Sequence, residues 1–152
     1  MEEDEYKATY NELASVRCVF EKALLNHQAK CGLSRHFCLA DREGYSCEDE
    51  PSSIKCCEFL EKLREKSTFV LKLHEINGPL PHNMEIRVQA GGLMGLVKLL
   101  DVKTENQSIT PVIDDIHRIL SMAKEEYGLW ENLPYSEIIQ SVVQFQGRRR
   151  RR

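Results

Sequence analysis

TPVIDDIHRILSMAKEEY, residues 110–127, is the stretch that indicates the fold class most directly. Thr110 followed by Pro111 is a typical helix start, because threonine caps free amide groups and proline is tolerated in the first turn. Apolar side chains then recur every three or four residues, as on one face of an α-helix. They are Val112, Ile113, Ile116, Ile119, Leu120, Ala123 and Tyr127. The stretch therefore predicts an amphipathic helix that packs on a core.

Helical periodicity continues on both sides of this stretch. Pro134 starts a predicted final helix that ends before Gly147, and residues 96–100 predict a short apolar helix. The glycines at positions 91, 92 and 95 favour a close helix crossing or a turn, because a missing side chain lets two backbones approach. They match neither a Walker loop nor a dinucleotide-binding fingerprint.

Two more helices are predicted in the first half of the chain. The first spans residues 3–28, where apolar side chains recur every three or four positions, and it includes Cys18. The second starts at Pro51 and continues with helical period to Leu71. Both are expected to place an apolar face on the same core.

Two segments lack this period. Residues 84–89, MEIRVQ, alternate apolar and polar side chains, so a small β-hairpin between Phe69 and Gln89 is an alternative to helix there. Residues 29–53 combine turn residues with charges and predict a long irregular connection. A structureless stretch of this length is uncommon unless something organises it, which favours a metal held by the cysteines that it carries.

The composition fits one soluble globular domain, because 41% of the 152 residues are hydrophobic and 30% are charged. We therefore expect a mainly α fold, with a single compact domain of four to six helices over residues 1–147 and a long cysteine-bearing loop. No apolar run is long enough for a membrane span, and the acidic start MEEDE is unlike a signal peptide. We expect a cytoplasmic location, where clustered cysteines more often bind metal than form disulfides.

The charge is divided between an acidic body and a basic terminus. Lysine and arginine number 21 against 24 aspartates and glutamates. Five of the basic residues are the arginines from Arg148 to Arg152, so the rest of the chain carries a net charge of −8. We expect these arginines to form a flexible tail that makes weak, salt-sensitive contacts with nucleic acid or an acidic protein surface. The acidic body argues against a general nucleic-acid coat or a membrane-surface protein.

All six cysteines lie between positions 18 and 57. Their spacing contains no C-x2-C pair of the kind that structural zinc sites commonly use. Widely spaced thiolates suit an iron–sulfur cluster, which is several ångströms across and collects ligands from scattered points. The preferred ligands of one [4Fe–4S] cluster are Cys18, Cys31, Cys47 and Cys56, with Cys38 and Cys57 as substitutes; zinc is the alternative metal.

Residues near these cysteines in the sequence support an anionic group. Cys56 and Cys57 are placed in the first turn of the second helix, where the helix dipole would stabilise thiolates. Positive side chains close to the predicted ligands would offset the negative charge of thiolates and sulfides. These are Arg17, Arg35, His36 and Arg42, of which His36 is also a candidate ligand or hydrogen-bond donor.

The leading functional hypothesis is a small iron–sulfur protein that works in electron transfer or redox sensing through a larger protein partner. The alternative is a zinc-stabilised or metal-free interaction module, a scaffold or adaptor. A third hypothesis is a thiol–disulfide switch, in which Cys56 or Cys57 reacts with Cys31 or Cys47. We expect no independent catalytic activity, because no nucleophile and base occur at a diagnostic spacing.

Overall fold

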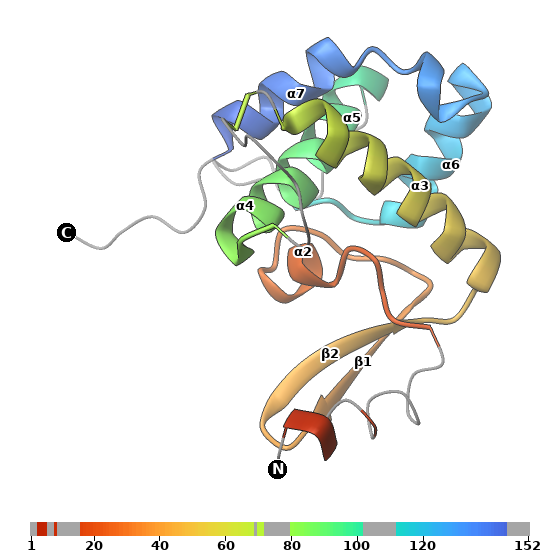
Figure 1. Cartoon of the computed structure of the whole chain (residues 1–152). Coiled ribbons are helices and arrows are strands. Elements are labelled where there is room, and N and C mark those ends of the chain that lie inside the picture. The colour runs from red at the N-terminus through yellow and green to blue at the C-terminus, as the bar shows by residue number, and fades with distance from the viewer. Residues whose placement is uncertain are drawn as a thin grey trace.

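The computed structural model of the chain describes residues 3–5, 8, 16–68, 70–71, 80–101 and 112–145. Within them the chain forms six α-helices of five residues or more and one antiparallel hairpin (Figure 1). The predicted mainly α-helical fold is confirmed. In chain order the elements are α2 (Glu21–Leu25), β1 (Ser34–Leu39), β2 (Arg42–Cys47), α3 (Glu50–Ser67), α4 (His82–Ile86), the π-helical turn η1 (Arg87–Gly91), α5 (Gly92–Leu100), α6 (Ile116–Tyr127), the 3-10 turn η2 (Trp130–Asn132) and α7 (Tyr135–Gln144).

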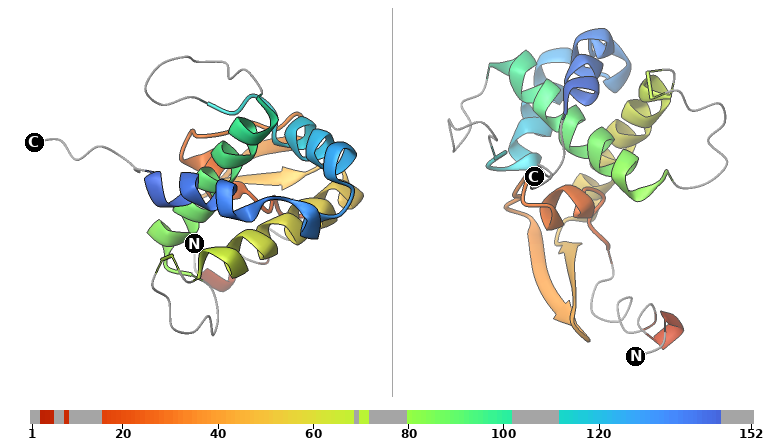
Figure 2. Two further views of the ribbon diagram at one scale, coloured as in Figure 1. Left: turned by 90° about the horizontal axis from the view of Figure 1, so that it is seen from above. Right: turned by 90° about the vertical axis from the view of Figure 1, so that its left-hand side faces the viewer.

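The helices form one body, from which the β1–β2 hairpin extends on the side of α2 (Figures 1 and 2). Two of the predicted helix starts are confirmed, since α3 has Pro51 in its first turn and α7 follows Pro134. The buried apolar faces of α3, α5, α6 and α7 build the core between them. None of the described helices combines the length and apolar character that crossing a membrane requires.

The glycines of QAGGLMG allow the close helix crossing that the sequence predicts. A β-carbon on Gly91 would lie 2.6 Å from the α-carbon of Val142, and one on Gly95 would lie 2.5 Å from the carbonyl oxygen of Ile138. Both neighbours are backbone atoms of α7, which cannot move aside as a flexible side chain can. The missing side chains therefore set the distance between α7 and the η1–α5 segment.

Replacing Gly91 with alanine is expected to destabilise the protein by about 1–3 kcal/mol, the usual cost of forcing extra volume into a packed core. Gly32→Ala is the matched control, because its added carbon would meet only an ordinary contact, 3.4 Å from Asp115 Oδ2. We expect that control to change the free energy of unfolding by no more than about 0.5 kcal/mol. Urea unfolding of both variants measures the difference, and equal stabilities would contradict the crossing.

In its described second half, the predicted helix over residues 3–28 is confirmed only at Glu21–Leu25 and is wrong for residues 16–20. Residues 16–18 are extended, because Arg17 forms a β-bridge with Ser46. The amide of Cys47 donates to the carbonyl of Val16 (2.8 Å), and helix α2 begins only at Glu21. Residues 6–7 and 9–15 of the predicted helix lie outside the described part of the chain.

The predicted irregular connection over residues 29–53 is also wrong, because it contains the β1–β2 hairpin. Its two-residue turn is Ala40 and Asp41, both with positive φ angles, 49° and 67°. This is the conformation that matches the twist of a two-residue hairpin. The hairpin considered between Phe69 and Gln89 is wrong, since the chain is helical from His82 onward; Phe69 lies outside the described residues.

The helix predicted from Thr110 begins later, at Ile116. Residues 102–111 lie outside the described part of the chain. Ile113 instead pairs with Ala29 in an isolated parallel bridge, in which the amide of Lys30 donates to the carbonyl of Ile113 (2.8 Å). This bridge brings the start of α6 beside the segment that leads into the hairpin.

Candidate metal centre

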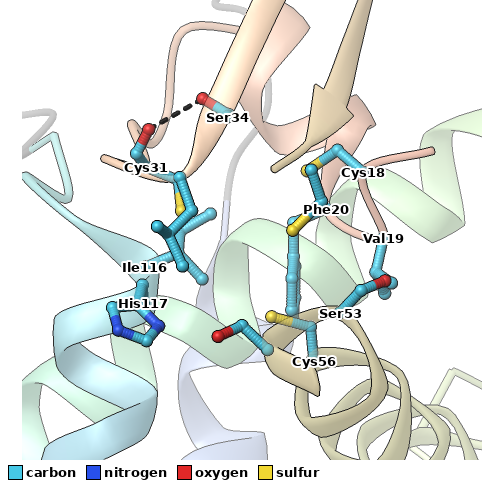
Figure 3. A pocket seen from close by; sticks show the side chains of 12 residues that line it. Cys18, Val19, Phe20, Cys31, Ser34, Ser53, Cys56, Ile116 and His117 are labelled. Carbon is cyan, nitrogen blue, oxygen red and sulfur yellow. Dashed lines mark hydrogen bonds between the residues drawn. The ribbon is translucent and has the colours of Figure 1, made fainter. Parts of the chain in front are cut away.

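Four cysteines line one pocket at the junction of the hairpin and the helical body. They are the four preferred ligands, Cys18, Cys31, Cys47 and Cys56. Their side chains come from different elements, and Figure 3 shows Cys31 and His117 on one side of the space with Cys18 and Cys56 on the other. The free volume of the pocket is about 20 Å³, so in this conformation its side chains nearly fill it. Residues far apart in the sequence are thus gathered around a single volume.

Cys18 and Cys47 are placed by the hairpin. The amide of Cys18 donates to the carbonyl of Tyr45 (3.0 Å), which fixes the Cys18 segment along the edge of β2. Cys47 is the last residue of β2, and its thiol donates to the carbonyl of Asp49 (3.2 Å). Cys18 therefore lies on an extended segment and not on the helix that was predicted for it.

Glu21, the first residue of α2, binds both the segment that carries Cys18 and strand β2. Its carboxylate accepts from the Arg17 guanidinium (2.7 Å to Nη2) and from the Tyr45 amide (3.0 Å). The side chain of Glu21 is only 10% exposed, and its hydrogen bonds to Arg17 and Tyr45 compensate the cost of burying its charge. The segment that carries Cys18 is thereby held between the helix and the hairpin.

Cys31 is placed by the loop between α2 and β1. Its carbonyl accepts from both the amide (3.1 Å) and the hydroxyl (2.7 Å) of Ser34, which closes a tight turn. On the other side, the amide of Gly32 donates to Asp115 (3.1 Å), next to the start of α6. Cys31 is therefore fixed both to the base of the hairpin and to the N-terminus of α6.

Cys56 and Cys57 point in different directions from α3. Cys56 lines the pocket, whereas Cys57 is exposed and its thiol lies 3.7 Å from Glu61 Oε1. Successive helical residues are rotated by about 100°, so only one of the two can face the pocket. Both lie in the second turn, since α3 begins at Glu50, and the predicted placement in its first turn is wrong.

Cys38 is separated from the pocket along the hairpin. It is exposed and lies four residues along β1 from Ser34, which lines the pocket. At about 3.3 Å per strand residue, this is a separation of about 13 Å. In this conformation Cys38 is not placed to substitute for a cysteine of the pocket.

Burial makes ionisation of the pocket thiols costly. It raises the pKa of Cys18 and of Cys56 to about 12 each, and it raises the pKa of Cys31 as well. A smaller contribution to the raised pKa of Cys56 comes from the thiolates of Cys18, Cys31 and Cys47, which would repel its negative charge. Burial thus raises the pKa of Cys56, whereas the thiol–disulfide hypothesis expects the helix N-terminus to lower it.

Backbone amides partly oppose this effect. The amides of Leu33 and His117 hydrogen bond to the Cys31 thiolate and lower its pKa, and the amide of Phe20 does the same for Cys18. Two serines from the first turn of α3, Ser52 and Ser53, also line the pocket. The positive ends of the α3 and α6 dipoles thus lie near the sulfurs, which favours a group with net negative charge.

The four positive side chains that were expected near the predicted ligands do not line the pocket. Arg17 pairs with Glu21 and Arg42 pairs with Glu3, while Arg35 and His36 are exposed on β1. Among the described residues, His117 is the ionisable side chain other than cysteine that lines the pocket. The sequence does not reveal this role of His117, because the residue reaches the site through the bridge between Ala29 and Ile113, which has no local sequence pattern.

The spacing of the four sulfurs bears on which metal group they would hold. A zinc ion with four thiolates at about 2.3 Å places the sulfurs about 3.8 Å apart. Among the described residues, no three of these sulfurs all lie within 4.8 Å of one another. In an iron–sulfur cluster each thiolate can bind a different iron, so the ligands stand further apart. In this conformation the four sulfurs therefore do not form a ready-made tetrahedral zinc site.

Comparison with known proteins adds no assignment to this geometry. No protein-family model, curated protein or solved structure matches the chain.

Proposed function

We propose that the chain is a small iron–sulfur protein that holds one [4Fe–4S] cluster through Cys18, Cys31, Cys47 and Cys56 and acts in electron transfer or redox sensing with a larger protein partner. The observation that carries this proposal is the meeting of these four cysteines around one pocket while the other two remain outside it. A bound cation would stabilise the thiolate forms of these cysteines and offset the repulsion between their negative charges.

The walls of the pocket suit such a group. Phe20, Leu33 and Ile116 are apolar neighbours of the cysteines, and they would shield a bound cluster from water. Amide hydrogen bonds to the sulfurs and the degree of solvent exposure are the features by which proteins tune the potential of a cluster. A cluster bound here would supply one-electron chemistry, while the chain's own residues position it and limit access of water.

The decisive measurement is the metal content of protein purified without oxygen. We expect a brown protein that contains iron and acid-labile sulfide in equal amounts, with four irons per chain for a [4Fe–4S] cluster. A colourless protein with one zinc per chain would support the zinc-stabilised interaction module instead. A metal-free protein that remains folded would contradict both metal assignments.

The proposed partner contact through the arginine tail has a separate test. Residues 148–152 lie outside the described part of the chain, and the proposal rests on the contrast between their charge and the net charge of −8 on the rest. Deleting them is expected to weaken binding to single-stranded DNA or an acidic peptide, and to flatten the salt dependence of that binding, because fewer counterions are released. Binding assays at two salt concentrations measure this effect. Identical binding at low salt would show that the tail is not a docking element.

A further inference from the structure

A second group of potential metal ligands lies on the exposed face of the hairpin, away from the cysteine pocket. It consists of His36, Cys38 and Glu43. Each residue offers one ligand atom: an imidazole nitrogen, a thiol sulfur and a carboxylate oxygen. These three atoms all lie within 4.8 Å of one another. The three residue types are all established ligands of zinc, and three protein ligands with an open fourth position form a common zinc geometry.

The register of the hairpin explains why these side chains meet. His36 and Cys38 are two residues apart on β1, so they project from the same face of the strand. Glu43 on β2 is directly opposite Cys38 in the antiparallel pairing. Directly opposed side chains are close neighbours on one face of a sheet. The backbone therefore presents all three groups together.

The imidazole of His36 is held in a suitable orientation by its neighbours. Its ring packs against the ring of Tyr45, the residue opposite it in the pairing, with 5.0 Å between centroids. Its Nε2 atom lies 3.4 Å from Glu43 Oε2. Ligand atoms around a tetrahedral zinc ion are separated by about 3.3–3.8 Å, so these two already stand at the required spacing.

We propose that His36, Cys38 and Glu43 form a surface site for one divalent zinc ion, with the fourth coordination position open to water. Binding at this site displaces the thiol proton of Cys38 to solvent, because zinc binds the thiolate. All three side chains are exposed, so the ion reaches the site directly from solution. This site does not depend on the proposed cluster, because it shares no residue with the pocket.

Titration of the full chain with Zn²⁺ under anaerobic, reducing conditions tests the site, by calorimetry and by competition with a chromophoric chelator. We expect the wild-type chain to bind one Zn²⁺ at this site. The variants Cys38→Ser, His36→Ala and Glu43→Gln should each bind it at least about tenfold more weakly, because loss of even a residue that only supports a metal ligand commonly lowers metal affinity by that factor. Cys57→Ser and Glu48→Gln are matched controls, since Cys57 and Glu48 are also exposed and lie outside the group. Both controls should bind Zn²⁺ as the wild type does.

Titration with Co²⁺ provides a readout that identifies the ligands. The thiolate-to-cobalt charge-transfer band should be weaker in Cys38→Ser than in the wild type, and Cys18→Ser should leave this difference unchanged, because the pocket cysteines contribute equally to both proteins. Equal Zn²⁺ stoichiometry and affinity in the wild type and all three variants would overturn the proposal. Weaker binding in Cys38→Ser alone would overturn it as well, since that result would mean a thiol that binds metal without the other two ligands.

Discussion

Replacing Cys56 with serine is expected to remove most of the bound iron, whereas the same replacement at the adjacent Cys57 is expected to leave it in place. Both residues lie on α3 and both substitutions replace a thiol with a hydroxyl, but of the two only Cys56 lines the pocket. A serine hydroxyl is a poor substitute for a thiolate, because iron–sulfur clusters are held chiefly by thiolate sulfur. Iron and sulfide content after anaerobic purification measures the difference.

The remaining cysteines extend this test. Serine at position 18, 31 or 47 should also lower the iron content strongly, whereas Cys38→Ser should retain it because Cys38 lies away from the pocket on the hairpin. Circular dichroism of each variant separates iron loss from unfolding. Equal iron in the Cys56 and Cys57 variants would refute the ligand set. Iron loss in the Cys38 variant would mean that the hairpin folds back over the pocket.

The helical part of the fold could be predicted from the sequence because its signals are local. Proline at the start of α3 and α7, and apolar side chains repeated at helical spacing, need no knowledge of distant contacts. The glycine-rich segment predicts a close helix crossing from local sequence as well, because the missing side chains let two helices approach. These are features that a residue and its near neighbours determine.

The hairpin could not be predicted in this way. Its turn, Ala40–Asp41, contains neither glycine nor asparagine, so the usual signal for two consecutive positive φ angles is missing. The extended segment around Cys18 was missed because its backbone pairs with β2, almost thirty residues later in the chain. Its apolar residues also occur at helical spacing, and the tertiary pairing overrides that local preference.

The candidate site was predictable in its residues and less so in its geometry. The sequence favours these four cysteines because they lie on or beside predicted ordered elements, and the structure brings all four to one pocket. The reason was partly incorrect, because Cys18 is extended and Cys56 is beyond the first turn of α3. His117 could not be found from the sequence, because its position depends on a contact between segments more than eighty residues apart.

Replacing Arg64 with alanine is expected to lower the free energy of unfolding by about 1–3 kcal/mol, because it removes the partly exposed cationic partner of a buried carboxylate. Arg64 Nη2 lies 2.5 Å from Glu85 Oε1, and the side chain of Glu85 is 5% exposed. Gln89 donates to the same carboxylate (2.9 Å) and accepts from the amide of Ala23 (3.1 Å). This network joins α3 to α2, the helix that follows Cys18.

Two further variants separate this effect from a general loss of charge. Lys62→Ala removes a cation from the same helix, but its contact with Glu65 is long (3.9 Å) and Glu65 is 64% exposed, so the expected loss is below about 1 kcal/mol. Replacing both Arg64 and Glu85 with apolar residues of similar volume should cost less than Arg64→Ala alone, because no buried charge is then unpaired. Urea unfolding of the three variants gives the comparison. A loss in Arg64→Ala no larger than in Lys62→Ala would show that Glu85 gains solvent when its partner is removed, and that the network does not hold α3 against α2.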